Sequence, residues 1–292
     1  MIELLLRIKN SLQNFILSME TFFKILFLSK FSAPIKKVKK DNNKLLILAN
    51  GPSLKGFLSS EIDFSAYDLL TVNFFPFTAY FKTLQPKYLL ITAPELWRKN
   101  VKQEYLDLSE QFFNTLMTDV SWPLYLFIPF ESRKFHNWQT KINSNNKIRI
   151  VHFNNTPVEG SKYLNHLFFA KNLGMPRPHN VLIPSLMMAI SMKYNQILLA
   201  GVDHSWLGEI SVTKDNEALV CQKHFYDEDT ATNQPMNQAG IRTRKLHEIL
   251  HKFYLTFKAY FEIEEYAVSK GVKIINCTPN SFIDAFEKKT LI

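Results

Sequence analysis

Short apolar runs alternate with longer amphipathic stretches along this chain of 292 residues. The apolar runs predict strands over 44–49, 68–73, 87–93, 122–129, 147–153, 194–201 and 272–277. Apolar residues at three- and four-residue steps predict helices over 1–32, 95–118, 162–173, 183–192 and 241–270. Strands that alternate with helices are typical of a parallel sheet. We therefore expect an α/β fold, Rossmann-like, with a mostly parallel sheet and helices on both faces.

Polar residues follow four of the predicted strands at their carboxyl ends. The first strand runs into Asn50-Gly51-Pro52-Ser53 and the last into Thr278-Pro279-Asn280-Ser281, while Asn73 and Asp203-His204 follow two others. Parallel strands bring these ends to one edge, where open α/β sheets bind ligands. Gly51 is expected to let the backbone pass close to a ligand or adopt a positive φ, and Ser53 to cap the next helix. An ordinary strand-to-helix turn is the alternative for 50–53.

The first 40 residues form a basic, amphipathic arm. Eight lysines and arginines against two glutamates give this arm a charge of +6, so only +3 of the total +9 remains for the body. That balance does not indicate a nucleic-acid surface. The arm has no apolar run of about 18 residues, as a transmembrane helix needs, and no signal-peptide pattern. We expect a helix lying in an anionic membrane surface, with the lysines of 36–40 facing headgroups. Packing on the body or on a second subunit is the alternative.

The remaining features set the compartment and the boundaries. Cys221 and Cys277 make neither a disulfide framework nor a zinc pattern, which favours a reducing compartment, the cytoplasm. His247 and His251 lie four residues apart, and we interpret them as a surface pair, so no metal is expected. The expected organisation is an arm at 1–40 and a nucleotide-binding domain at 41–292, with a polar lid at about 207–240. A homo-oligomer is possible.

Three segments resemble those of a known group of enzymes. They are Leu48-Ala49-Asn50-Gly51-Pro52-Ser53, the segment from Tyr194 to Gly201-Val202-Asp203, and Cys277-Thr278-Pro279-Asn280-Ser281. In this order they resemble the bacterial family 42 sialyltransferases. They also resemble the broader group of proteins related to the archaeal pterin diphosphokinase. That group includes glycosyltransferases of surface polysaccharides, such as lipopolysaccharide or capsule, and of flagellin.

The resemblance implies a Rossmann-like domain of the GT-A-variant type and a CMP-activated sialic acid as donor, with no metal required. It implies that Asn50, Gly51 and Ser53, with Pro52 in the same turn, contact the phosphate and ribose of the donor. Asn73 would lie near the phosphate. The turn of Pro279, Asn280 and Ser281 would lie on the nucleotide side. The acceptor would be a hydroxyl group of a glycan or of a lipid-linked sugar.

Two histidines compete for the role of general base. His224 lies in the expected lid, where the resemblance implies a catalytic histidine, and His204 follows a strand end beside Asp203. Histidine side chains titrate near neutral pH and suit this role. We favour His224 as base, on a lid that orders when nucleotide binds. His204 would position donor or acceptor, with Asp203 holding its tautomer or a ribose hydroxyl. A carboxylate base, Asp203 or Asp227, is the further alternative.

The leading hypothesis is a glycosyltransferase on the inner face of the cytoplasmic membrane. It would transfer a sialic acid-like or other nonulosonic sugar from a nucleotide donor, with Trp206, Tyr226 and Asp227 positioning sugar or acceptor. The second hypothesis is a diphosphokinase-like phosphotransferase that uses ATP and Mg²⁺, for which Asp203 and the lid carboxylates would be ligands. The third is a membrane-bound scaffold without activity.

Overall fold

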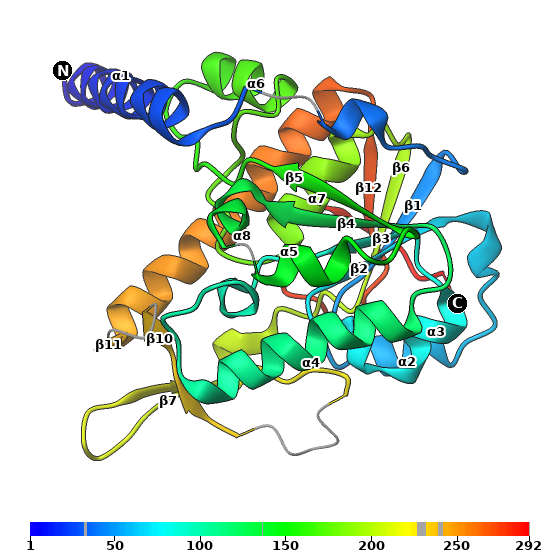
Figure 1. The fold of residues 1–292 in the computed structure, drawn as a ribbon. Helices are drawn as coiled ribbons and strands as arrows, with labels where there is room; N and C mark the ends of the chain where they lie inside the picture. Colours follow the sequence, from blue (N-terminus) through cyan, green and yellow to red (C-terminus); the bar gives the residue numbers. More distant parts are fainter. Residues whose placement is uncertain (32–33, 136, 227–231, 239–241, 292) are drawn as a thin grey trace.

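The apolar runs of the sequence form one parallel β-sheet, seen in a computed structural model that describes residues 1–31, 34–135, 137–226, 232–238 and 242–291 (Figure 1). The strand order is β13-β12-β6-β1-β2-β3-β4-β5, and all neighbouring strands are parallel. The strands are β1 (Lys44–Leu48), β2 (Asp68–Val72), β3 (Tyr88–Leu90), β4 (Leu124–Pro129), β5 (Ile148–Phe153), β6 (Gln196–Ala200), β12 (Lys273–Asn276) and β13 (Glu287–Lys288). The predicted α/β, Rossmann-like fold is confirmed.

Helices cover both faces of the sheet because its strands alternate between two cores. Leu45 and Ile47 of β1 face the core shared with α7 and α8, and Leu46 and Leu48 face the core shared with α2 to α5. All four side chains are fully buried. The helices are α1 (Ile2–Leu28), α2 (Leu54–Leu58), α3 (Ala79–Leu84), α4 (Gln103–Asp119), α5 (Asn137–Ile142), α6 (Lys162–Ala170), α7 (Leu182–Ser191) and α8 (Leu246–Ser269).

Individual residues set the ends of three helices. Pro184 lies in the first turn of α7, where its missing N–H costs nothing. Gly271 follows α8 with φ +69°, the left-handed conformation that ends helices. The helix expected over 95–118 begins at Gln103, because Leu96 and Trp97 are buried beneath α4. The Ser109 hydroxyl holds this preceding turn by donating to Leu96 O at 2.8 Å.

The region expected as a polar lid forms small antiparallel sheets. The strands β7 (Ile210–Val212), β8 (Ala218–Val220) and β9 (Gln234–Pro235) make one, and β10 (Asn237–Gln238) pairs with β11 (Arg242–Thr243). Ala218 and Val220 are buried against Ile249 and Phe253 of α8. The described part of this region therefore has a small apolar core of its own, which the polar composition did not predict.

The second half of α1 is bonded to the body, and the first half projects from it (Figure 1). The Thr21 hydroxyl donates to Glu159 O at 2.7 Å and accepts from its N–H at 2.9 Å. Ile25 is 3% exposed in the core, and the Ser29 hydroxyl donates to Leu173 O. The opposite side of α1 is exposed along its length. In the described part of the chain, no helix is long and apolar enough to cross a membrane.

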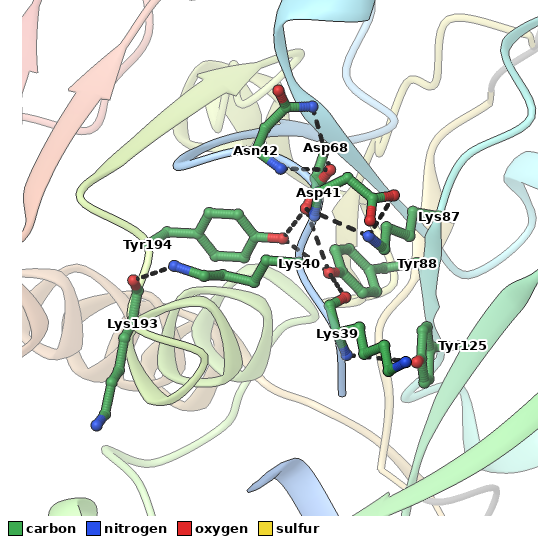
Figure 2. A network of polar contacts seen from close by, with 10 residues as sticks. All are labelled: Lys39, Lys40, Asp41, Asn42, Asp68, Lys87, Tyr88, Tyr125, Lys193 and Tyr194. Atoms are coloured by element: carbon green, nitrogen blue, oxygen red, sulfur yellow. Dashed lines mark hydrogen bonds and ion pairs between the residues drawn. The ribbon is translucent and has the colours of Figure 1, made fainter. Parts of the chain in front are cut away.

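A buried carboxylate fixes the segment that leads from the arm into β1 (Figure 2). Asp68 is 3% exposed and accepts from the N–H groups of Asp41 and Asn42 at 3.0 and 3.2 Å, and from the hydroxyl of Tyr194. The hydroxyls of Tyr194 and Tyr88 lie 2.7 Å apart, and burial raises the pKa of both. The network lies at the amino ends of the strands, opposite the expected ligand edge, and holds residues 39–42 in place.

Candidate active site

A cleft of about 480 Å³ lies beyond the carboxyl ends of β1 and β6. The chain runs from β1 through β2 to β5 on one side of the sheet and returns as β6 on the other side of β1. This is the topological switch point, the position where open α/β sheets bind ligands. Of the sequence-predicted residues, the cleft is lined by Asn50, Gly51, Pro52, Asn73, Asp203, His204, Trp206, His224 and Tyr226.

Asp203, which follows β6, holds the loop after β1 in place through hydrogen bonds. Ser53 donates its N–H to Asp203 Oδ1 at 3.2 Å and its hydroxyl to Oδ2 at 2.8 Å. Gly51 donates its N–H to Gly201 O at 2.8 Å, and a Cβ at Gly51 would lie 2.0 Å from Asp203 Oδ2. Gly51 therefore lets the backbone pass close to Asp203 and does not have a positive φ. The Ser53 hydroxyl was expected to cap the next helix, but it donates to Asp203 instead. Burial raises the pKa of Asp203, against the two bonds from Ser53.

Two asparagines line the cleft floor after β1 and β2. The side-chain amide of Asn50 donates to Val72 O at 3.3 Å. Its Oδ1 atom is buried and has no hydrogen-bond partner within the described ranges. Asn73 has φ +45°, and its Oδ1 accepts from the Thr92 N–H at 3.0 Å. A buried acceptor without a donor is costly, so Asn50 Oδ1 suits a hydrogen-bond donor on a ligand.

His204 is held as a neutral acceptor. It is 8% exposed, with φ +54°. Asn180 Oδ1 accepts from the N–H groups of Leu182 and Ile183, which orients the Asn180 amide so that its Nδ2 faces His204 Nε2 at 3.1 Å. Nε2 must then accept, and the Tyr260 hydroxyl lies 2.5 Å from the same atom. Burial lowers the pKa of His204 to about 3. Because the lone pair of Nε2 already accepts a hydrogen bond, His204 is better suited to hold its neighbours in position than to act as a general base.

His224 lies in a segment anchored to the body by its neighbour. Phe225 is buried against Phe75 and donates its N–H to Asn50 O at 3.0 Å. The rings of His224 and Tyr226 stack, with centroids 5.1 Å apart and planes 3° apart. Phe225 therefore anchors the segment around His224 to the core, and a lid that orders when nucleotide binds stays a prediction. Asp227 lies outside the described residues.

Trp206 forms an aromatic wall of the cleft with His204. The two ring centroids lie 4.2 Å apart, and Trp206 also packs 5.3 Å from Phe253. Trp206 is half-buried and lines the cleft. The ring also packs against the small core under β7 and β8, and its contact with a sugar stays a prediction.

The turn after β12 does not line the cleft. Ser281 is 3% exposed, and its hydroxyl donates to Val202 O at 2.6 Å. Phe282 donates its N–H to Asp203 O at 2.9 Å, and Pro279 and Asn280 are exposed outside the cleft. This turn supports the segment that carries Asp203 from behind, because β6 separates β12 from β1. Any contact of Pro279, Asn280 or Ser281 with a donor therefore stays a prediction.

The cleft lining also includes His179, Asn180, Glu95 and Lys252, which were not among the predicted site residues. Glu95 follows β3 in Thr92-Ala93-Pro94-Glu95, the same strand-to-polar-turn pattern as 50–53, and could have been found by it. Lys252 lies three and four residues from Ile249 and Thr256 on the buried stripe of α8. A lysine on the inward face of an amphipathic helix is an anomaly that marks a site.

Within the described residues, no group of three histidine, cysteine, aspartate or glutamate side chains is placed to hold a metal ion. No protein-family model matches the chain, and a search of curated proteins also finds no match. The resemblance stated from the sequence therefore stays a prediction.

Proposed function

We propose that the protein is a glycosyltransferase that moves a sugar from a nucleotide donor to a hydroxyl group of a glycan or lipid-linked acceptor. The observation that carries the proposal is the composition of the cleft at the switch point. It combines amide side chains, an aromatic face and a histidine at the mouth of a Rossmann-like sheet. Such sites bind nucleotides in this fold class, and aromatic faces pack against sugar rings.

His224 is the proposed general base. As the acceptor oxygen bonds to the anomeric carbon, its proton passes to His224. The bond from the anomeric carbon to the phosphate oxygen breaks, and its electron pair leaves with the nucleotide. His204, whose Nε2 faces Asn180 and Tyr260, holds Trp206 in position for the sugar. The preferred donor is CMP-linked, because that is what the sequence resemblance implies.

A thermal-shift screen tests the donor class first. The full-length protein is heated with CMP, UDP, GDP or ATP, each with and without Mg²⁺, since a ligand that binds the native state raises the unfolding temperature. A shift with CMP alone supports the proposal. A shift that requires both ATP and Mg²⁺ favours the phosphotransferase, whose lid carboxylates Asp227, Glu228 and Asp229 lie outside the described residues. No shift with any nucleotide favours the scaffold.

Turnover tests the base. His224→Asn is compared with the parent by release of CMP from CMP-N-acetylneuraminic acid. His247→Asn, on the exposed side of α8, is the matched control. We expect kcat to fall about 10²- to 10⁴-fold for His224→Asn, the usual contribution of a general base, with CMP affinity unchanged. Parental turnover in His224→Asn would transfer the role to a carboxylate such as Glu95 or Asp203.

The proposed location is the cytoplasm, peripheral on the inner face of the membrane. The projecting helix α1 supports it, because large apolar side chains are exposed along its length. They are Leu4, Leu5, Ile8, Leu12, Phe15, Ile16, Met19, Phe22, Phe23, Leu26, Phe27 and Leu28. Exposed Lys9, Lys30 and Lys37 provide positive charge next to this surface. A second copy of the chain is the alternative partner.

A further inference from the structure

The loop after β1 is poorly suited to the phosphate that the sequence assigned to it. The N–H of Gly51 and both donors of Ser53 are already bonded to Gly201 O and to Asp203, and Pro52 has no N–H. The Asp203 side chain also lies directly beneath the loop. A phosphate here would meet occupied donors and a neighbouring carboxylate, so another part of the cleft must receive it.

Basic side chains of α8 and of the turn before α7 gather at one wall of the cleft. Lys252 of α8 and His179, which precedes α7, both line the cleft. Burial lowers the pKa of His179 to about 4, and Lys252, Arg177, Arg244 and His251 act on it in the same direction. Burial and the charge of Arg244 lower the pKa of Lys252. His179 is therefore a neutral hydrogen-bonding group near pH 7, and Lys252 is the cation of this wall, which would attract an anion.

Among the described residues, the donors of this wall have no anionic partner. Lys252 is half-buried and forms no ion pair within the described ranges, and its ammonium group donates a hydrogen bond to the sulfur of Met236 at 3.9 Å. His179 Nε2 and Arg244 Nε are buried without a hydrogen-bond partner in the same part of the structure. Burial of a cation without an anion costs stability, which a fold does not retain for packing alone. These groups are arranged for a ligand.

We infer that Lys252 and His179, with Arg244 behind them, form the subsite that binds the phosphate of the nucleotide donor. The inference rests on the proposed function for the identity of the ligand. Lys252 supplies the charge, and His179 Nε2 supplies a hydrogen bond to a phosphate oxygen. The sugar then lies between this wall and the stacked pair of His224 and Tyr226 on the other side of the cleft.

Calorimetry with two matched lysine variants tests the subsite. Lys252→Met keeps the apolar stem and removes the charge. Lys258→Met removes a lysine of the same helix that is exposed and paired with Glu262 at 3.5 Å. The probes are CMP, cytidine, inorganic phosphate and free N-acetylneuraminic acid. We expect Lys252→Met to weaken CMP binding about 10- to 100-fold, the usual contribution of a hydrogen bond to a charged group. Cytidine binding and the Lys258→Met variant should match the parent.

The ligand-free proteins provide a second readout. Because Lys252 has no anionic partner in the part of the chain that the structure describes, Lys252→Met should unfold at the same temperature as the parent or higher, whereas loss of a merely structural residue would lower it. His179→Gln, which keeps a donor at this position, should retain most of the CMP affinity. If Lys252→Met does not fold, His179→Leu takes its place, with the same expected loss of CMP binding.

Each outcome decides one claim. Parental CMP affinity in Lys252→Met overturns the subsite, and so does a parent that binds none of the anions. Loss of N-acetylneuraminic acid binding with CMP binding retained assigns the wall to the sugar carboxylate and overturns the phosphate. A parent that binds inorganic phosphate through Lys252 but binds no nucleotide confirms the subsite and refutes the proposed function.

Discussion

The buried imidazole of His204 makes the stability of the fold depend on pH. Its pKa falls from 6.5 in the unfolded chain to about 3 in the native protein, because burial disfavours the charged ring. The unfolded chain therefore takes up a proton first as the pH falls. The contribution of the neutral ring to stability is complete above pH 6.5 and is lost between about pH 6.5 and pH 3. Between pH 7 and pH 5, uptake of a proton by this side chain in the unfolded chain lowers the free energy of unfolding by about 2 kcal/mol.

Neighbouring groups explain why the native ring resists protonation. A proton on Nε2 would face the N–H of Asn180, whose amide orientation is fixed by two backbone N–H groups of α7. The Tyr260 hydroxyl could turn to accept, but Asn180 could not. The ring is 8% exposed, so water cannot compensate.

Urea unfolding at pH 7 and pH 5, followed by tryptophan fluorescence at constant ionic strength, measures the effect. His204→Gln should lose about 2 kcal/mol less than the parent between the two pH values, whatever its stability at pH 7. Tyr260→Phe keeps the histidine, its burial and Asn180, and should therefore lose as much as the parent. The half-buried His152 and His179 are present in all three proteins and cancel in the comparison. An equal loss in His204→Gln and the parent would refute the reasoning.

Three further predictions follow from the packing. Asp68→Ala should lower the free energy of unfolding by about 3–5 kcal/mol in urea titrations, because several buried donors lose their acceptor; a loss below 1 kcal/mol would show that they re-pair. Gly51→Ala should cost about 1–3 kcal/mol and weaken nucleotide binding, since the new Cβ overlaps Asp203; parental calorimetry would contradict it. Leu5→Glu with Leu12→Glu should abolish sedimentation with anionic liposomes without changing the unfolding temperature, while light scattering tests for a dimer.

The sequence predicted the sheet because strand burial is encoded locally. Each of the seven predicted strands is present, within three residues at either end. A continuous apolar run such as Leu45–Leu48 can bury all of its side chains only in a strand that lies between two cores. The eighth strand, β13, has two residues, and its pattern is too short to read. Parallel pairing brings the carboxyl ends of the strands to one edge, and nine of the predicted site residues line the cleft at that edge.

The roles of individual residues depended on contacts that no local pattern records. Ser53 is at a position typical of a helix cap, but its hydroxyl donates to Asp203, which lies 150 residues later in the chain. The turn containing Ser281 repeats the design of the turn after β1, yet the position of β6 between the two strands excludes it from the cleft. Lys252 differs, because the apolar pattern of 241–270 already places it on the buried stripe of α8, so the sequence alone could have indicated it as a site residue.

The two walls of the cleft are linked through Asn180. This residue caps the start of α7 with Oδ1 and bonds His204 and Tyr260 with Nδ2, so it ties the end of β6 to the start of α7. His179 is its immediate neighbour in the chain. The position of the cationic wall therefore depends on the same amide that keeps His204 neutral. A change at Asn180 would disturb the proposed anion subsite and the aromatic wall together, although it removes no charge from either.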